Sequence, residues 1–173
     1  MLEALIFVVF PFCMVFAAVS DMVSMTIANR VPIILAAAFM IVAPLTGMDW
    51  ALYGWHVLAG ALVLAVTFCL FAMGGMGGGD AKLLAATALW MGFSIELMQY
   101  LVYAAILGGM LTVLLILYRG STLAVFTGGN LFQRHFADKK VGVPYGVALG
   151  LAGLIVYPST ALMQWALTRL VAA

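Results

Sequence analysis

The sequence predicts an all-α, polytopic integral membrane protein with six transmembrane helices. Of its 173 residues, 67% are apolar and only 8% are charged, whereas a soluble domain averages about 25% charged residues. The apolar residues gather into runs of about 20, the length that crosses the hydrocarbon core as a helix. Lys and Arg fall almost entirely between alternate runs, as expected for loops on one side of a membrane.

Six apolar stretches follow one another along the chain, at about residues 2–20, 31–48, 51–73, 80–93, 95–117 and 141–172. The first is expected to stay as a membrane helix, because it opens with Glu3 and lacks the basic start of a secretion signal. Asp21 ends it. Val31-Pro32 opens the second stretch, where proline is tolerated in the first turn. Pro158 interrupts the last stretch, which is interpreted as one long kinked span, with two shorter segments as the alternative.

The basic residues orient these spans. The loops after the first, third and fifth spans hold six of the seven: Arg30, Lys82, Arg119, Arg134, Lys139 and Lys140. The loops after the second and fourth spans hold none, and Arg169 is the exception. Cytoplasmic loops carry the excess of Lys and Arg, so both termini are expected on the outer side. The net charge of +1 gives no indication of a nucleic-acid partner.

The longest connection, residues 118–141, contains glycines, scattered aromatic residues and a basic end. An ordinary polar loop is the simplest interpretation, since connections between helices usually run over the surface. Its basic residues could also hold it against anionic headgroups. A lid or a docking surface is the alternative.

Two of the six carboxylates stand out. Glu3, Asp49 and Glu96 fall at outer ends of spans, where a charge costs little, and Asp138 adjoins two lysines; none of them requires a function. Asp21 ends the first span and Asp80 opens the fourth, both at the cytoplasmic edge of the hydrocarbon. An ionisable group at that depth is a functional hypothesis by default.

The fourth span is short. Residues 81–93 would make about 20 Å of helix, while the hydrocarbon core is about 30 Å thick. We therefore expect Asp80 to lie below the membrane surface, with the preceding glycines forming a re-entrant turn in "GGMGGGDAKLL", residues 74–84. Glycine suits such a turn because it accepts unusual backbone angles and lets another backbone come close. Lys82 can extend back to the surface.

A paired carboxylate site beside a bare backbone is typical of peptide hydrolysis. Two carboxyl groups that share one site do not both ionise easily. One would act as the general base for a water molecule, and the other would stay protonated and donate to the scissile carbonyl. His56 and His135 do not pair with a serine or cysteine nucleophile, and Cys13 and Cys69 are isolated, so no metal-ligand spacing is present.

Three blocks of sequence resemble a known family. "GGGD" at residues 77–80, followed by "AKLL", resembles the GxGD signature of intramembrane aspartyl proteases. Asp21, with "TIANRVP" after it, is similar to the first catalytic block of the type IV prepilin peptidases, and "VPYGVALGLAGL" at residues 143–154 resembles their last-helix block. The chain length is similar to that of their short CpaA/TadV-type branch, which serves Flp (type IVb) pili.

The resemblance implies a GxGD aspartyl protease fold in one transmembrane peptidase domain, residues 1–173. It implies that Asp21 and Asp80 are catalytic, that Gly77 and Gly79 shape the turn before Asp80, and that Lys82 is a candidate accessory residue. The implied reaction removes a basic leader from a prepilin, at the cytoplasmic face of the bacterial inner membrane, with both termini periplasmic. No metal or other cofactor is implied, and the partners are the prepilin, the bilayer and other pilus-assembly proteins.

One departure from the larger members of that family bears on the activity. They carry a cysteine-rich zinc domain and also methylate the new N-terminus, whereas only about ten residues separate the first two spans here. Peptidase activity alone is therefore expected. Three alternatives remain: a proton or ion conduit that uses the same two acids, a pilus-assembly scaffold that binds through glycine faces such as Gly142, Gly146 and Gly150, and a related preflagellin peptidase.

Overall fold

The computed structural model describes residues 1–121 and 142–172, and these ranges fold entirely into helices and their connections. The elements are α1 (Leu2–Ser24), α2 (Arg30–Leu45), α3 (Trp50–Ala72), α4 (Gly78–Met91), α5 (Ile95–Gly120), α8 (Tyr145–Val156), the 3-10 turn η1 (Tyr157–Ser159) and α9 (Ala161–Val171). The predicted all-α class is therefore confirmed. Most of the 118–141 connection, for which a lid or docking surface was an alternative, lies outside the described residues.

Three helices, α1, α3 and α5, are long and apolar enough to cross a membrane. Helices α8 and α9 would add a fourth span if the pair counts as one, since they meet at a bend of 50°. The break at η1 contains Pro158, so the predicted interruption of the last apolar stretch is confirmed, and a single kinked span over α8 and α9 stays a prediction. Helices α2 and α4, with 16 and 14 residues, fall short of that length. The chain is thus a membrane protein by length and composition, and six spans remain a prediction.

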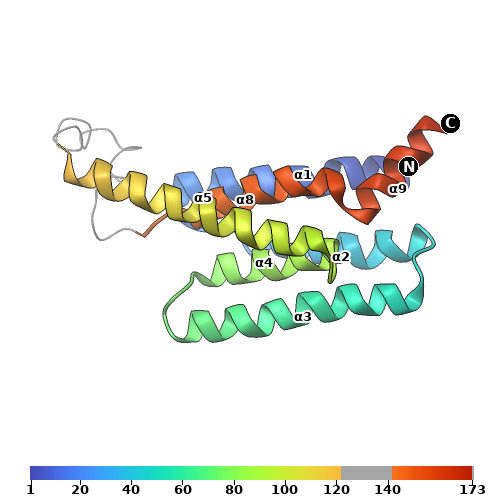
Figure 1. Ribbon diagram of the computed structural model, residues 1–173, viewed down its shortest axis with the longest axis horizontal. Coiled ribbons are helices and arrows are strands. Elements are labelled where there is room, and N and C mark those ends of the chain that lie inside the picture. The colour runs from blue at the N-terminus through green and yellow to red at the C-terminus, as the bar shows by residue number, and fades with distance from the viewer. Residues whose placement is uncertain (122–141, 173) are drawn as a thin grey trace.

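The helices run back and forth, so that their connections collect at two ends of the bundle (Figure 1). The two termini lie at one end. The other end, named here the aspartate end, gathers residues 21–30, the turn at 73–77 with the start of α4, and the residues that end α5 and begin α8. Segments far apart in the sequence therefore meet at the aspartate end.

Local signals explain where several helices begin and end. The carboxylate of Asp49 caps α3 by accepting hydrogen bonds from the backbone N–H groups of Ala51 and Leu52 at 2.9 and 3.4 Å. This cap accounts for Asp49 without a catalytic role. Helix α4 ends at Gly92, which has a φ of 65° and a ψ of −169°, a backbone conformation that is essentially limited to glycine.

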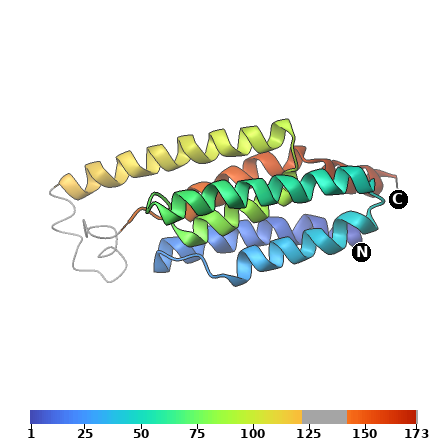
Figure 2. The same ribbon diagram turned by 90° about the horizontal axis from the view of Figure 1, so that it is seen from below.

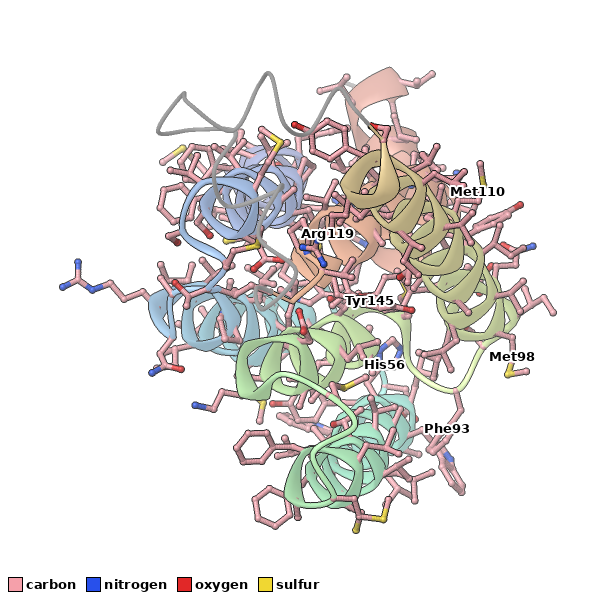
Figure 3. All side chains as sticks on the ribbon, turned by 90° about the vertical axis from the view of Figure 1, so that its left-hand side faces the viewer. His56, Phe93, Met98, Met110, Arg119 and Tyr145 are labelled. Carbon is pink, nitrogen blue, oxygen red and sulfur yellow. The ribbon has the colours of Figure 1, made fainter. Side chains whose placement is uncertain are left out.

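The short helix α4 lies inside the bundle. Ala81 and every residue from Leu83 to Met91 are buried, because α4 packs against α3, α2 and α8. Viewed along the bundle, α4 and α8 occupy its middle, and the other helices surround them (Figure 3). The expected mismatch between a short helix and the hydrocarbon thickness is thus resolved by burial in protein, where irregular backbone at membrane depth is tolerated.

Aromatic side chains in the core join several of these helices. Phe10 of α1 stacks on Tyr157 with ring centroids 4.0 Å apart and meets the edge of Trp90 of α4 at 5.5 Å. The phenol of Tyr157 donates to the Ile6 carbonyl at 2.7 Å, and the Trp90 indole donates to the Leu35 carbonyl at 3.0 Å. Aromatic side chains with satisfied polar tips hold α1, α2, α4 and η1 at fixed separations.

Candidate active site

Asp21 lies in the last turn of α1 and is 5% exposed. Helix α1 stops one turn later, where Met25 takes a left-handed φ of 53° and its N–H donates to the Asp21 carbonyl at 2.8 Å. A non-glycine residue in that conformation is uncommon. The turn redirects the chain at once, so the residues after Met25 pass beside the carboxyl group of Asp21 instead of continuing the helix.

A second segment, 125 residues further along the chain, fixes the Asp21 side chain. The backbone N–H of Gly146, in the first turn of α8, donates to Asp21 Oδ2 at 2.6 Å. The first N–H groups of a helix have no partner within the helix, and a carboxylate satisfies them well. A Cβ atom at Gly146 would lie 2.8 Å from Asp21 Oδ2 and 2.8 Å from Ile27 Cδ1. Only glycine leaves room for this contact.

Asp80 occupies the first turn of α4, which begins after the N-cap Gly77. Its carboxyl group folds back over that cap: a Cβ atom at Gly77 would lie 2.7 Å from Asp80 Oδ2. A carboxylate beside the N-terminus of a helix is stabilised by the helix dipole, by about 0.3–1 kcal/mol at exposed sites. The glycine-rich turn thus leaves space for the acid beside the helix end.

The glycines before Asp80 matter because they leave room for neighbouring atoms, and not because they adopt unusual backbone angles. In the motif turn, only Gly74 has a positive φ, 76°. Gly77 and Gly79 have no positive φ, which corrects the expectation that unusual φ and ψ would explain them. At Gly79 a Cβ atom would lie 3.1 Å from Ile27 Cβ, so glycine lets the start of α4 approach the connection after α1.

The structure brings Asp21 and Asp80 together at one cavity of about 230 Å³. The lining comes from the end of α1, the connection after it and the start of α4: Asp21, Met25, Thr26, Ile27, Asn29, Gly77, Gly78, Gly79 and Asp80. The two acids are close enough for the charge on one to act on the other. The cavity has room for several waters, each of which takes about 30 Å³ in the liquid. An acid pair beside bare glycine backbone can activate a water molecule against an extended chain that lies along that backbone.

Lys82 lies beside this cavity instead of within its lining. Its Nζ donates to Asn29 Oδ1 at 2.8 Å, and Asn29 in turn lines the cavity. The candidate accessory residue therefore joins the start of α4 to the start of α2. It could position the connection around the acids without touching a substrate bound to them.

Tyr145 is a neighbour of the site that the sequence did not single out by itself. Its phenol donates to the Ala104 carbonyl of α5 at 3.2 Å, and its ring occupies the space where a Cβ at Gly108 would sit. It lies within electrostatic reach of Asp80, and Figure 3 shows it near the middle of the bundle. Tyr145 and Gly146 both fall in the "VPYG" block, so that block was the available signal for them.

Arg119 also lies at the aspartate end. It donates to the Gly142 carbonyl at 3.0 Å and ties the end of α5 to the segment before α8.

In residues 1–121 and 142–172, no three His, Cys, Asp or Glu side chains lie close enough together to bind a metal ion. His56 lies near the other end of α3, where its Nδ1 is 2.7 Å from the Leu89 carbonyl and its ring packs against Gly92. Asp21 and Asp80 are therefore the candidate catalytic groups among the described residues.

Comparison with known proteins agrees with this geometry. The model of the type IV leader peptidase family matches residues 8–117, which contain both Asp21 and Asp80. The match covers well over half of the chain, and the chain therefore belongs to the type IV leader peptidase family. Membership implies a protease embedded in a membrane, with a prepilin as substrate. Searches of curated proteins and of solved structures returned no match.

Proposed function

We propose that this member of the type IV leader peptidase family is an aspartic endopeptidase of the bacterial inner membrane. It removes the basic leader from type IVb, Flp-type, prepilins at the cytoplasmic face and so prepares them for pilus assembly. The observation that carries the proposal is the shared cavity of Asp21 and Asp80, bordered by the glycines of the GxGD-like motif.

In the proposed mechanism one acid is the general base and the other is the proton donor. One carboxylate takes a proton from a water molecule, and the resulting hydroxide attacks the scissile carbonyl carbon. The other carboxyl group, protonated, donates to the carbonyl oxygen and stabilises the tetrahedral intermediate. The pair then returns the proton to the leaving amine as the peptide C–N bond breaks. Gly146 holds Asp21 Oδ2, so Asp21 Oδ1 is the oxygen left for water.

The glycines beside Asp80 leave room for the substrate in the cavity. Residues 77–79 present backbone without side chains to the cavity, and an extended peptide can approach such backbone closely. Holding the scissile bond against fixed acids supplies much of the acceleration that enzymes obtain from proximity and orientation. Gly77 and Gly79 therefore shape the site by staying small.

The basic residues support a cytoplasmic aspartate end. Arg30, Lys82 and Arg119 belong to that end, while Arg169 is in the last turn of α9, near the termini. Cytoplasmic segments carry the excess of Lys and Arg. The remaining basic residues, Arg134, Lys139 and Lys140, fall outside the described residues. Both termini are then proposed to be periplasmic.

Two features favour a peptidase over the other functions. A proton conduit needs a chain of polar groups free to relay protons. Among the described residues, the buried hydroxyls of Thr67, Thr87 and Thr160 donate to backbone carbonyls, and Tyr100 alone has a buried hydroxyl without a partner, which makes no chain. A scaffold needs free glycine faces, yet of the three glycines named for it only Gly142 is open, and a Cβ at Gly146 or at Gly150 would collide with α1. The connection at residues 25–29 is too short for a zinc domain, so we propose no methyl transfer.

Replacement of either acid by its amide tests the proposal. Asp21→Asn and Asp80→Asn remove the proton transfer while keeping side-chain size, so each variant is expected to reach the membrane and leave the prepilin uncut. Co-expression with a candidate prepilin, followed by gel electrophoresis, measures leader removal as a mobility shift. Asp49→Asn is the matched control, because asparagine is an equally good helix cap, and it should cut normally. Leader removal by either catalytic variant would contradict the assignment.

A further inference from the structure

A second hollow lies on the side of the bundle, between α2 and α3, and we name it the lateral groove. These two helices are joined through residues 46–49, yet each packs on α4 far more than on the other (Figure 2). The gap between them is a groove of about 330 Å³. Ile33 and Ala36 of α2 form one wall, Ala61 of α3 stands on the other, and Ala85 of α4 lies on the floor.

The groove is open to the outside of the bundle. Ile33 on its rim is 64% exposed and Ala61 is exposed, whereas Ala85 on the floor is buried. Along α4 the lining runs from Lys82 to Leu89, a length of about 10 Å at 1.5 Å per residue. Small side chains on the floor and walls let another helix approach closely within a bilayer. The groove therefore has the length, polarity and depth to seat about two turns of an apolar helix.

The groove opens beside the cavity of the two acids. Lys82, which lines its end, donates to Asn29 at 2.8 Å, and Asn29 lines the cavity. Lys82 also follows Asp80 by only two residues on α4. A chain that leaves the cavity at the aspartate end thus reaches the groove by passing over the Lys82–Asn29 hydrogen bond, at the starts of α4 and α2.

We propose that the lateral groove receives the apolar helix that follows the cut in the substrate. The inference rests on the proposed function, because the reaction that the family resemblance implies cuts a prepilin just before its hydrophobic helix. The helix would lie against α4 between α2 and α3, and the polar chain before it would bend past Asn29 into the cavity. Binding of the substrate helix in the groove fixes how far the substrate chain before it extends into the cavity. The position of the helix therefore selects the peptide bond that is cut.

Filling the groove tests this placement. Ala61→Trp puts a large ring into the groove, while Leu62→Trp puts the same ring on a neighbouring position, 52% exposed, that does not line it. We expect kcat/KM for a full-length prepilin to fall by about 10²-fold in Ala61→Trp only, since a misplacement of about 1 Å costs that much. Cleavage of a leader peptide that lacks the apolar helix should be equal in both variants and wild type. Equal cleavage of the full-length prepilin by both variants would overturn the inference.

A crosslinking experiment keeps the inference testable if Ala61→Trp fails to fold. Ile33, exposed on the groove rim, is replaced by p-benzoylphenylalanine in the Asp80→Asn background, with Leu62 replaced in the same way as the control. Irradiation should join the prepilin helix to position 33 and not to position 62. Adducts with lipid alone at position 33, or equal prepilin adducts at both positions, would overturn the inference. Prepilin adducts at position 33 without any cleavage by the wild type would instead overturn the proposed function.

Discussion

Gly146→Ala perturbs Asp21 without changing either acid. The new methyl group would lie 2.8 Å from Asp21 Oδ2, 2.9 Å from Asp21 Cβ and 2.8 Å from Ile27 Cδ1. Contacts this short cannot persist, so the Asp21 side chain has to move. Its hydrogen bond with the Gly146 N–H, now 2.6 Å, would lengthen or break. The substitution therefore tests whether α8 positions the acid.

The expected loss follows from the hydrogen bond. Hydrogen bonds to charged groups contribute about 1.5–3 kcal/mol, and about 1.4 kcal/mol corresponds to a tenfold change in rate. Breaking this bond should lower kcat/KM for leader removal by about 10- to 150-fold. Overpacking should also cost about 1–3 kcal/mol of folding stability, so the amount of folded protein has to be measured alongside the rate.

The assay compares Gly146→Ala with Gly153→Ala, two changes on the same helix. A Cβ at Gly153 would lie 3.0 Å from Met14 Sδ, part of a flexible side chain that can move aside. Cleavage of a purified prepilin is followed by mobility shift in detergent, with rates divided by the amount of folded enzyme. Gly153→Ala is expected to stay near the wild-type rate.

Two results would refute this reasoning. Gly146→Ala could cleave at the wild-type rate, which would mean that Asp21 needs no support from α8. Alternatively, Gly153→Ala could lose as much activity as Gly146→Ala at an equal amount of folded protein. The spacing of α1 and α8 as a whole, and not the single contact to Asp21, would then control the rate.

Two further predictions concern other glycines. Gly77→Ala should slow leader removal, because its Cβ would lie 2.7 Å from Asp80 Oδ2, while Gly75→Ala, with its nearest atom at 3.5 Å, should cut prepilin normally in the same assay; equal rates would contradict the spatial role. Gly92→Ala should lower the thermal aggregation temperature in detergent more than Gly47→Ala. Both positions have positive φ, which costs about 1–2 kcal/mol for alanine, but only Gly92 also has the buried imidazole 2.7 Å from its Cβ; a smaller effect at Gly92 would contradict this packing.

Much of the secondary structure was predictable, because helix formation in an apolar run is a local property. The predicted start of the third span, residue 51, differs by one residue from the observed Trp50. The end of the first was placed at residue 20, but α1 continues to Ser24. An acidic residue, Asp21, marked the boundary in the sequence, whereas in the structure it is buried and hydrogen bonded within the last turn of the helix. Local polarity alone could not have revealed a partner 125 residues away.

The sequence by itself determined that this is a helical membrane protein and that Asp21 and Asp80 deserve to be considered as a pair. Apolar length and the rarity of membrane carboxylates are properties of the chain that need no neighbours. Only the tertiary structure decided that α4 is interior, that Gly146 binds Asp21, and that α2 and α3 part to leave a groove. These features depend on the distances between packed helices, which are set by side-chain volumes on both sides of each contact.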